Sequence, residues 1–353
     1  MSPPSKLVQP TKNTRNTSYM PPTVHVVAPS RLHFGLMNFG GDAGRQFGGV
    51  GLMIDEPGLR LELFPASEFQ ATGNLAWRIH EFARRWQAFH CLNALPHCMI
   101  RVLAAPREHT GLGVGTQLGM SIAAGLSRFV GLPTQTPIEL AGSVGRGQRS
   151  AVGAYGFVLG GLIAERGKLP REPVSPLDCY LQLPASWRVV LVCPRDFSGL
   201  ASEDESRAFA TLPPVPEAVT SKLARIARDE MIPAAARNDF EGFAAAVYAY
   251  GRLSGECFTP LQGGAYNGPR LAGIVARLQA LGVTGVGQSS WGPTIFALLR
   301  DEENAEQIRY AIAESDEARN CDINVSGISR AGASVVAEVA SESLTNENSP
   351  IER

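Results

Sequence analysis

The stretch HTGLGVGTQLGMSIAAGLSRFVG, residues 109–131, places alternating glycines directly before an apolar run at helical spacing. The glycines are Gly111, Gly113 and Gly115. A strand pattern precedes the loop, and we expect the helix to begin near Thr116 and Gln117. The free N–H groups of a first helical turn bind anions, and glycines let backbone amides approach a phosphate. Tight packing is the alternative, because the loop matches neither the Walker A nor the GxGxxG pattern.

Two other segments carry groups that suit an anion. GRGQRSAVG holds Arg146 and Arg149 among small residues, and GVGQSSWGPT holds Ser289 and Ser290 in a turn between apolar strands. Each segment also has a plain explanation, a solvated turn for the first and a hairpin for the second. The three segments together favour an anionic ligand more than any one of them does.

The composition indicates a folded chain of about two domains. The chain has 353 residues, 44% of them hydrophobic and 18% charged, enough to bury a sizeable core. Its 32 basic and 33 acidic residues give a formal net charge of -1, so no global basic field would recruit nucleic acid or an anionic membrane. No apolar run is long and clean enough to span a bilayer.

The cysteine pattern favours reduced thiols in a cytoplasmic protein. No C-x-x-C pair occurs and no histidine cluster lies beside the cysteines, so we do not expect a zinc site. The six cysteines are Cys91, Cys98, Cys179, Cys193, Cys257 and Cys321.

Strand and helix patterns alternate without a regular βαβ rhythm, which favours an α+β fold. Residues 1–21 and 341–353 are polar and lack periodicity, so we expect disordered tails, and the first has no apolar core typical of a secretory signal. The proline-rich segment 167–186 is the best candidate linker. We therefore expect an N-terminal domain over 22–180 and a C-terminal domain over 181–340.

Local patterns predict individual elements. TVHVVAPSRLHFGLM predicts a strand that leads into a second strand or bend, and a turn at Pro57–Gly58 is expected to separate two further strands. Apolar residues at helical spacing predict a helix over 75–89. Thr136, Pro137 and Glu139 form a helix-start signature.

These segments together resemble the GHMP superfamily, named for galactokinase, homoserine, mevalonate and phosphomevalonate kinases. APSRLHFGL resembles its first motif, HTGLGVGTQLGMSIA its central phosphate loop, and GVGQSSWGPTIFAL its third motif. The order and the spacing agree, over about residues 22–340. The resemblance implies a ribosomal-protein-like βαβ N-terminal domain and a ferredoxin-like α/β sandwich as the C-terminal domain.

The match is closer to one branch of the superfamily, the β-ribofuranosylaminobenzene 5′-phosphate synthases. SRLHFGLMNF, RQFGGVGLMIDEP and GRGQRSAVGAYGFVLGG look like the segments of that family. The resemblance implies a pentosyltransferase that condenses phosphoribosyl pyrophosphate with 4-aminobenzoate or 4-hydroxybenzoate. It would release carbon dioxide and pyrophosphate, in methanopterin biosynthesis. The charge of the leaving pyrophosphate calls for Mg²⁺ and N–H donors to neutralise it. Nothing in the composition points to these substrates.

The resemblance and the chemistry together suggest roles for single residues. Arg31 falls where the kinases carry a catalytic Lys or Arg, and we expect it to neutralise phosphate. His33 is a candidate for orienting a substrate, and a strand histidine that faces the edge of the core is the alternative. The loop 111–117 would bind pyrophosphate. Asp55 or Asp42 is a candidate magnesium ligand, although each has the ordinary explanation of a turn residue.

Departures from the superfamily pattern keep two other functions open. The central loop has Val114, Gly115 and Thr116 where the kinases have Gly-Ser-Ser, and the segment GRGQRSAVG lacks the aspartate that many of the kinases use as a base. An ATP-dependent small-molecule kinase is the first alternative, and a non-catalytic ligand-binding protein is the second. A homodimer also remains open.

Overall fold

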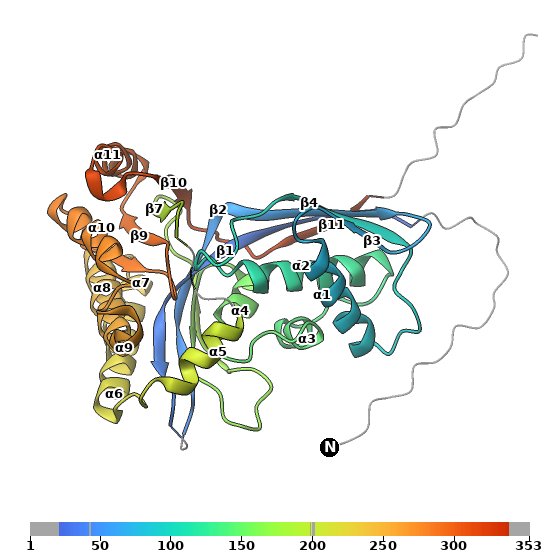
Figure 1. The fold of residues 1–353 in the computed structure, drawn as a ribbon, viewed down its shortest axis with the longest axis horizontal. Coiled ribbons are helices and arrows are strands. Elements are labelled where there is room, and N and C mark those ends of the chain that lie inside the picture. Colours follow the sequence, from blue (N-terminus) through green and yellow to red (C-terminus); the bar gives the residue numbers. More distant parts are fainter. Residues whose placement is uncertain (1–20, 42–43, 198, 200–201, 339–353) are drawn as a thin grey trace, which may run out of the picture.

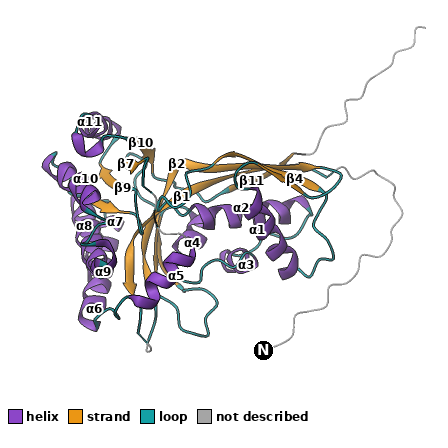
Figure 2. Cartoon of the chain, in the orientation of Figure 1, coloured by secondary structure: helices purple, strands orange, loops and turns teal. Residues whose placement is uncertain are grey.

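The computed structural model describes residues 21–41, 44–197, 199 and 202–338. The expected tails therefore fall outside the described residues, apart from residue 21 of the first. Figures 1 and 2 show two β-sheets with helices packed against them. The chain is thus a mixed α+β fold with two sheets, as the patterning predicts.

The first sheet has seven strands in the order β11-β1-β2-β4-β3, and β5 and β6 extend it from β2. Its strands are β1 (Thr23–Asn38), β2 (Phe47–Pro65), β3 (Gln70–Thr72), β4 (Cys98–Ala104), β5 (Leu162–Glu165), β6 (Leu177–Leu181) and β11 (Ser334–Glu338). The last of these strands lies beside the first, because β11 pairs antiparallel with β1. The expected division of the chain at 180/181 stays a prediction, and β11 returns across it.

Two expected strand pairs are instead single long strands, which corrects the expected bend and turn. β1 runs through the Pro29–Ser30 position with a register shift, and β2 runs through Pro57–Gly58. The Ser30 hydroxyl donates to the Pro57 carbonyl at 2.6 Å and ties the two strands together there. A Cβ at Gly58 would lie 2.8 Å from the Asp55 carbonyl oxygen, so this glycine permits close backbone packing in place of a turn.

Four helices cover one face of the first sheet (Figure 1). They are α1 (Ala76–Phe89), α2 (Val114–Phe129), α3 (Pro137–Ser143) and α4 (Val152–Leu159). The predicted helix-start signature is confirmed, since Thr136 and Glu139 form a reciprocal capping box at α3. Helix α2 begins at Val114, two residues earlier than expected, because Gly113 adopts a left-handed φ of 75° as its N-cap.

The second sheet has four strands in the order β10-β7-β9-β8. They are β7 (Arg188–Pro194), β8 (Val286–Gln288), β9 (Ile295–Leu299) and β10 (Cys321–Gly327). The helices of this half are α5 (Ser202–Thr211), α6 (Glu217–Arg225), η1 (Ile226–Met231), α7 (Ile232–Ala236), α8 (Phe240–Glu256), α9 (Thr259–Gln262), α10 (Pro269–Ala280), α11 (Glu302–Ala313) and η2 (Asp316–Ala318). The expected strand, glycine–serine turn and strand over 283–300 are confirmed as β8 and β9.

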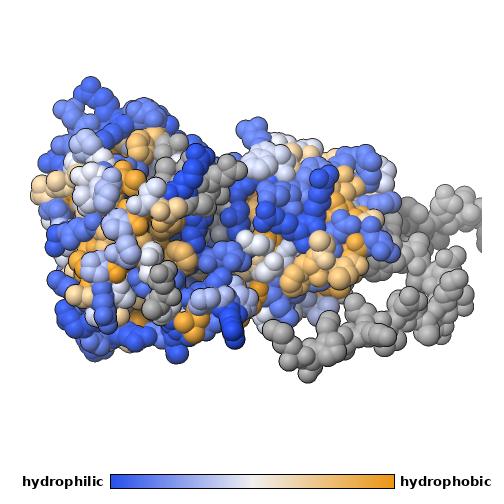
Figure 3. Space-filling view, turned by 60° about the horizontal axis from the view of Figure 1, so that its bottom comes forward, coloured by the Kyte–Doolittle hydropathy of each residue, from blue (hydrophilic) through white to orange (hydrophobic). Residues whose placement is uncertain are grey.

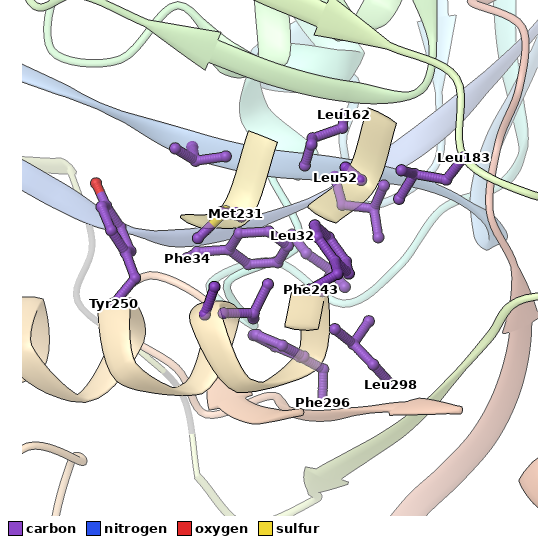
Figure 4. Packing of buried hydrophobic residues seen from close by; sticks show 14 of the residues in the cluster. Leu32, Phe34, Leu52, Leu162, Leu183, Met231, Phe243, Tyr250, Phe296 and Leu298 are labelled. Carbon is purple, nitrogen blue, oxygen red and sulfur yellow. The ribbon is translucent and has the colours of Figure 1, made fainter. Parts of the chain in front are cut away.

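A continuous apolar core joins the two halves of the molecule (Figure 4). Leu32 and Phe34 from β1 pack against Phe243 of α8 and Phe296 of β9, and the rings of Phe34 and Phe296 lie 5.3 Å apart. Each fully buried side chain of this size contributes about 1.5–3 kcal/mol. The core therefore fixes the two sheets against each other, and the site described below lies between them.

The expected linker needs a correction. Residues 167–186 include β6, which pairs with β5 and so belongs to the first sheet. Its prolines lie on both sides of the strand, where no ladder hydrogen bond is lost.

In the described part of the chain, no helix is long and apolar enough to cross a membrane. Figure 3 shows one face of the molecule, where hydrophobic patches lie among hydrophilic side chains.

Candidate active site

The segments 28–36, 109–123 and 285–298 meet at one place between the two sheets. The Arg31 N–H of β1 donates to the Leu112 carbonyl in the loop before α2 at 3.0 Å. The Ser289 hydroxyl accepts from the His33 N–H at 3.0 Å and donates to the Gly111 carbonyl at 2.7 Å. Segments far apart in the sequence are therefore held together by backbone and hydroxyl hydrogen bonds.

Ser289 was expected to donate to an anion, and the structure contradicts this. Its only hydroxyl proton is directed at the Gly111 carbonyl, and its side chain is fully buried. Ser290, the next residue, does line the site, and its φ of 56° turns the chain there. Ser289 thus holds the loop in place, and only Ser290 remains available to a ligand.

We expect Ser289→Ala to lower the free energy of unfolding by about 1–3 kcal/mol, because it leaves the part-buried Gly111 carbonyl and the buried His33 N–H without their partner. Urea unfolding followed by circular dichroism measures the change. Ser290→Ala is the matched control. Among the described residues, Ser290 forms hydrogen bonds through its backbone N–H and carbonyl, which the substitution keeps. Equal losses in the two variants would contradict the assignment of Ser289.

A cavity of about 150 Å³ lies over the start of α2, and arginines surround it. A Cβ on Gly113 would lie 3.2 Å from Arg31 Nε, and one on Gly115 would lie 2.6 Å from an Nη atom of Arg78. The two glycines therefore let guanidinium groups lie directly against the first turn of the helix. Arg146 lies next to this turn as well, and Thr116 also lines the cavity.

Several of these guanidinium nitrogens are buried and without a partner among the described residues. They are Nε and Nη1 of Arg31 and Nε of Arg146. Burial lowers the pKa of each side chain to about 10, and for Arg146 the positive charge of Arg78 adds to the effect. Both groups remain charged at neutral pH. Buried cationic donors that lack partners are typical of a site for a phosphate or another anion.

Arg78 was not singled out in the sequence, although a signal was present. It lies on the apolar stripe of α1, one turn before Phe82, and its guanidinium stacks 5.6 Å from the centre of that ring. Glu108 pairs with Arg78 and sits at the edge of the same cavity. A charged residue in an otherwise apolar helix stripe is a marker of a buried functional group.

A second cavity, of about 290 Å³, adjoins the first and shares lining residues with it. The shared residues are Arg31, Thr116, Arg146, Glu205, Ser290 and Trp291. Arg149 lines the larger cavity, where its Nη2 lies 2.9 Å from Glu205, and the other carboxylate oxygen of Glu205 accepts from the Trp291 indole at 2.9 Å. Glu205 therefore orients both Arg149 and Trp291, and it was not predicted.

Gln117 was expected to bind phosphate, and the structure places it elsewhere. Its side-chain amide donates to the Gly153 carbonyl at 3.0 Å, and only 1% of the residue is exposed. It lines neither of the two cavities. Gln117 thus ties α2 to α4, because the first helical turn rotates its side chain away from the ligand side.

His33 lines the larger cavity and is neutral. Burial, and then the charge of Arg31, lower its pKa well below the ordinary value of 6.5. The Gly35 N–H donates to Nδ1 at 3.2 Å, so the ring proton is on Nε2, which lies 3.1 Å from the Ser150 hydroxyl. His33 therefore orients Ser150 at the start of the segment leading to α4.

We expect the buried neutral His33 to make the fold less stable in acid. The contribution of the neutral His33 ring to the free energy of unfolding is fully present above about pH 6.5 and falls at lower pH. The reason is that the imidazole takes up a proton in the unfolded chain but stays neutral in the folded one. The slope is at most about 1.4 kcal/mol per pH unit for one group. Urea unfolding between pH 5 and 8 measures it in the wild type and in His33→Gln. His25→Gln is the control, since 39% of that side chain is exposed; an unchanged slope in His33→Gln would contradict the prediction.

Glu165, at the end of β5, is a further buried group that the sequence analysis missed. Its Oε2 accepts from the Ala151 N–H at 2.8 Å, while Oε1 is buried without a partner among the described residues. Burial raises the pKa of Glu165, and hydrogen bonds, ahead of the nearby Arg31 charge, oppose that shift. Glu165 therefore holds the end of the segment 145–151 through Ala151, and its charge partly offsets the charge of Arg31. The pattern LIAERG looked like an ordinary strand end.

Asp55 was expected as a magnesium ligand, and the structure contradicts this. It lines a separate cavity with Glu56 and Arg188, beside β10, and neither of the two cavities above. Asp42 lies outside the described residues. Within the described residues no group of three or more His, Cys, Asp or Glu could hold a metal ion. Glu205 and Glu108, the carboxylates that line the site, each pair with an arginine.

Comparisons with known proteins agree with this architecture. Residues 231–318 match the family model for the C-terminal part of the GHMP kinases. The chain is 29% identical over 308 residues to β-ribofuranosylphenol 5′-phosphate synthase of Methanothermobacter thermautotrophicus, covering 81% of this chain and 91% of that relative. The synthase of the same name from Archaeoglobus fulgidus is 28% identical over 312 residues, covering 81% and 90%.

Two solved structures share the fold of this chain. A homoserine kinase from Cytophaga hutchinsonii aligns with a TM-score of 0.64 at 17% identity, covering 92% of this chain and all of that one. A mevalonate diphosphate decarboxylase from Staphylococcus aureus aligns with a TM-score of 0.62 at 13% identity, covering 89% and 98%. At these identities the likeness establishes the fold, which confirms the expected GHMP-kinase-like architecture.

Proposed function

We propose that this chain, which belongs to the GHMP kinase superfamily, transfers a phosphoribosyl group to a 4-hydroxy- or 4-aminobenzoate with loss of carbon dioxide. The donor would be phosphoribosyl pyrophosphate. The names of the two archaeal relatives support a ribosylated phenol 5′-phosphate as the product. Both relatives are covered over about nine-tenths of their length, so the similarity extends over most of each relative.

One observation carries the proposal: a cationic cavity and an aromatic-lined cavity adjoin and share Arg31 and Arg146. The smaller cavity has the helix N-terminus that a pyrophosphate needs, together with guanidinium nitrogens to which no described residue is hydrogen-bonded. The larger cavity is lined by Phe209, Phe258 and Trp291, which suit an aromatic ring. A phosphoribosyl donor in the first would present its anomeric carbon to a ring in the second.

The reaction needs no redox partner. The bond from the anomeric carbon to the pyrophosphate oxygen breaks, and its electron pair leaves on pyrophosphate. The ring carbon that bears the carboxylate bonds to the anomeric carbon. The bond from that ring carbon to the carboxylate then breaks, its electron pair restores the aromatic ring, and carbon dioxide leaves. Arg31, Arg146 and the amides of the 111–117 loop would stabilise the charge that develops on pyrophosphate.

Magnesium would bind together with the phosphoribosyl pyrophosphate rather than at a metal site of the protein. The described site offers mostly guanidinium groups, which repel a cation, and its carboxylates are paired with arginines. These residues do not form a magnesium site of their own. A magnesium ion would therefore have to be carried by the pyrophosphate oxygens, whose charge it would help to neutralise.

Product analysis separates this function from a kinase. The protein is incubated with magnesium, phosphoribosyl pyrophosphate and 4-hydroxybenzoate or 4-aminobenzoate, without ATP, and the products are identified by mass spectrometry. We expect a ribosylated phenol or aniline 5′-phosphate that lacks the carboxylate. ADP formation from ATP with homoserine or mevalonate, and no ribosylated product, would instead identify a kinase. Binding of the donor without turnover of either kind would indicate a ligand-binding protein.

A further inference from the structure

An aromatic wall closes one side of the larger cavity, and its members come from distant parts of the chain. Phe209 lies on α5, Phe258 directly before α9, and Trp291 between β8 and β9. The ring centres of Phe258 and Trp291 are 4.8 Å apart, and those of Phe209 and Trp291 are 5.5 Å apart, in edge-to-face geometry. The hydrogen bond from Trp291 to Glu205 fixes the indole, so the wall is preorganised for a flat ring.

A buried side-chain amide whose oxygen meets no hydrogen-bond donor in the described part of the chain lines the same cavity. Gln262, the last residue of α9, is only 7% exposed, and its Oε1 has no hydrogen-bond partner among the described residues. Gln288 lines the cavity as well, but both ends of its amide are used: Oε1 accepts from Asn267 N–H at 2.7 Å, and Nε2 donates to the Ser290 carbonyl at 3.0 Å. A buried acceptor left open costs free energy, which a donor on a ligand would recover.

We propose that Gln262 reads the para substituent of the aromatic acid, a step that rests on the proposed function. The ring lies along the wall of Phe209, Phe258 and Trp291, and its para hydroxyl or amino group donates to Gln262 Oε1. The carboxylate-bearing carbon then faces the end of the cavity that holds Arg31 and Arg146, where the phosphoribosyl donor binds. Substrate orientation and specificity thus depend on one side-chain oxygen.

The chemistry of the ring agrees with this placement. A para O–H and a para N–H are both donors, so one acceptor serves either substrate. Electron donation from that group raises the electron density at the opposite ring carbon, which is the carbon that must attack. A hydrogen-bond acceptor at the para group strengthens this donation as positive charge develops in the ring. Gln262 therefore lowers the barrier to attack as well as binding the substrate.

A cycle of protein and ligand changes tests the proposal. Calorimetry measures the Kd of 4-hydroxybenzoate, 4-aminobenzoate and benzoate, which has no para donor, on wild-type protein and on Gln262→Leu. We expect Gln262→Leu to weaken both para-substituted acids about 10-fold or more and to leave benzoate within about twofold. Gln148→Leu is the matched control, because Gln148 lines the same cavity but is exposed and its Oε1 bonds to Lys168.

Each outcome decides the matter. Equal weakening of all three ligands, or no weakening of any, would overturn the role of Gln262. Should Gln262→Leu not fold, the ligand comparison on wild-type protein stands alone: benzoate and 4-methoxybenzoate binding as tightly as 4-hydroxybenzoate would overturn it. If Gln262→Leu leaves the Kd of all three ligands unchanged and wild-type protein still converts the substrate, the role of Gln262 is wrong and the proposed function stands. Wild-type protein that neither binds nor converts any aromatic acid would remove the proposed function itself.

Discussion

Arg31→Ala is expected to reduce kcat/KM for phosphoribosyl transfer by about 30-fold to several thousand-fold. This range corresponds to ~2–5 kcal/mol of lost transition-state stabilisation, the scale of one preorganised electrostatic group. The physical reason is the position of the guanidinium: Nε and Nη1 are buried, unpartnered among the described residues and packed against Gly113 at the start of α2. Steady-state kinetics with varied phosphoribosyl pyrophosphate measures the effect.

Two further variants show whether the geometry or only the charge of Arg31 matters. Arg31→Lys keeps the charge and loses the planar fork, so we expect it to retain a small part of the activity. Arg60→Ala is the control, because Arg60 lies on β2 with 53% of its side chain exposed and pairs with Glu56, which is equally exposed. Near wild-type turnover in Arg31→Ala, with the fold intact by circular dichroism, would remove Arg31 from the site.

Gly113→Val is expected to weaken phosphoribosyl pyrophosphate at least about 100-fold. Two effects act together at this position: the backbone has a φ of 75°, which a β-branched residue adopts poorly, and a Cβ would press on Arg31 at 3.2 Å. The added atoms would displace the guanidinium and cover the amides of the first helical turn. Charge-assisted hydrogen bonds of about 1.5–3 kcal/mol each would be lost. Calorimetric titration with the donor measures the affinity.

Gly131→Val separates the two effects. Gly131 follows the same helix and has a φ of 74°, and a Cβ at this position would meet no described atom within 4 Å. It carries the same backbone strain without reaching the site, so we expect a similar loss of stability and unchanged affinity. Unchanged donor affinity in Gly113→Val, in a folded protein, would return the loop to a purely structural role.

The sequence predicted the parts of the site that follow from local rules. The glycine loop, the capped helix α3 and the hairpin of β8 and β9 all depend on residues close together in the chain. The contacts that bring the segments 28–36, 109–123 and 285–298 together were not predicted. Their hydrogen bonds span up to 256 residues, such as the one from His33 N–H to Ser289, and no local pattern encodes such contacts.

The residues that the sequence did not reveal owe their significance to burial and to neighbours that are distant in the sequence. Glu165 and Arg78 look like an ordinary strand end and a helix residue, and only burial beside Arg31 and Gly115 makes them unusual. Gln262 ends a helix of four residues and becomes notable through its open oxygen. Conversely, Asp55 was a candidate metal ligand as an acidic residue, but it lines a separate cavity. The sequence does not show which part of a long strand meets the site.

The most direct test of the central proposal follows the carboxylate. Protein, magnesium, phosphoribosyl pyrophosphate and carboxyl-labelled 4-hydroxybenzoate are combined without ATP, and labelled gas and pyrophosphate are counted together. Attack by the carboxylate-bearing carbon requires the two products in a ratio of one to one. Pyrophosphate release without labelled carbon dioxide would contradict it, because transfer to the para oxygen or nitrogen would leave the carboxylate in place.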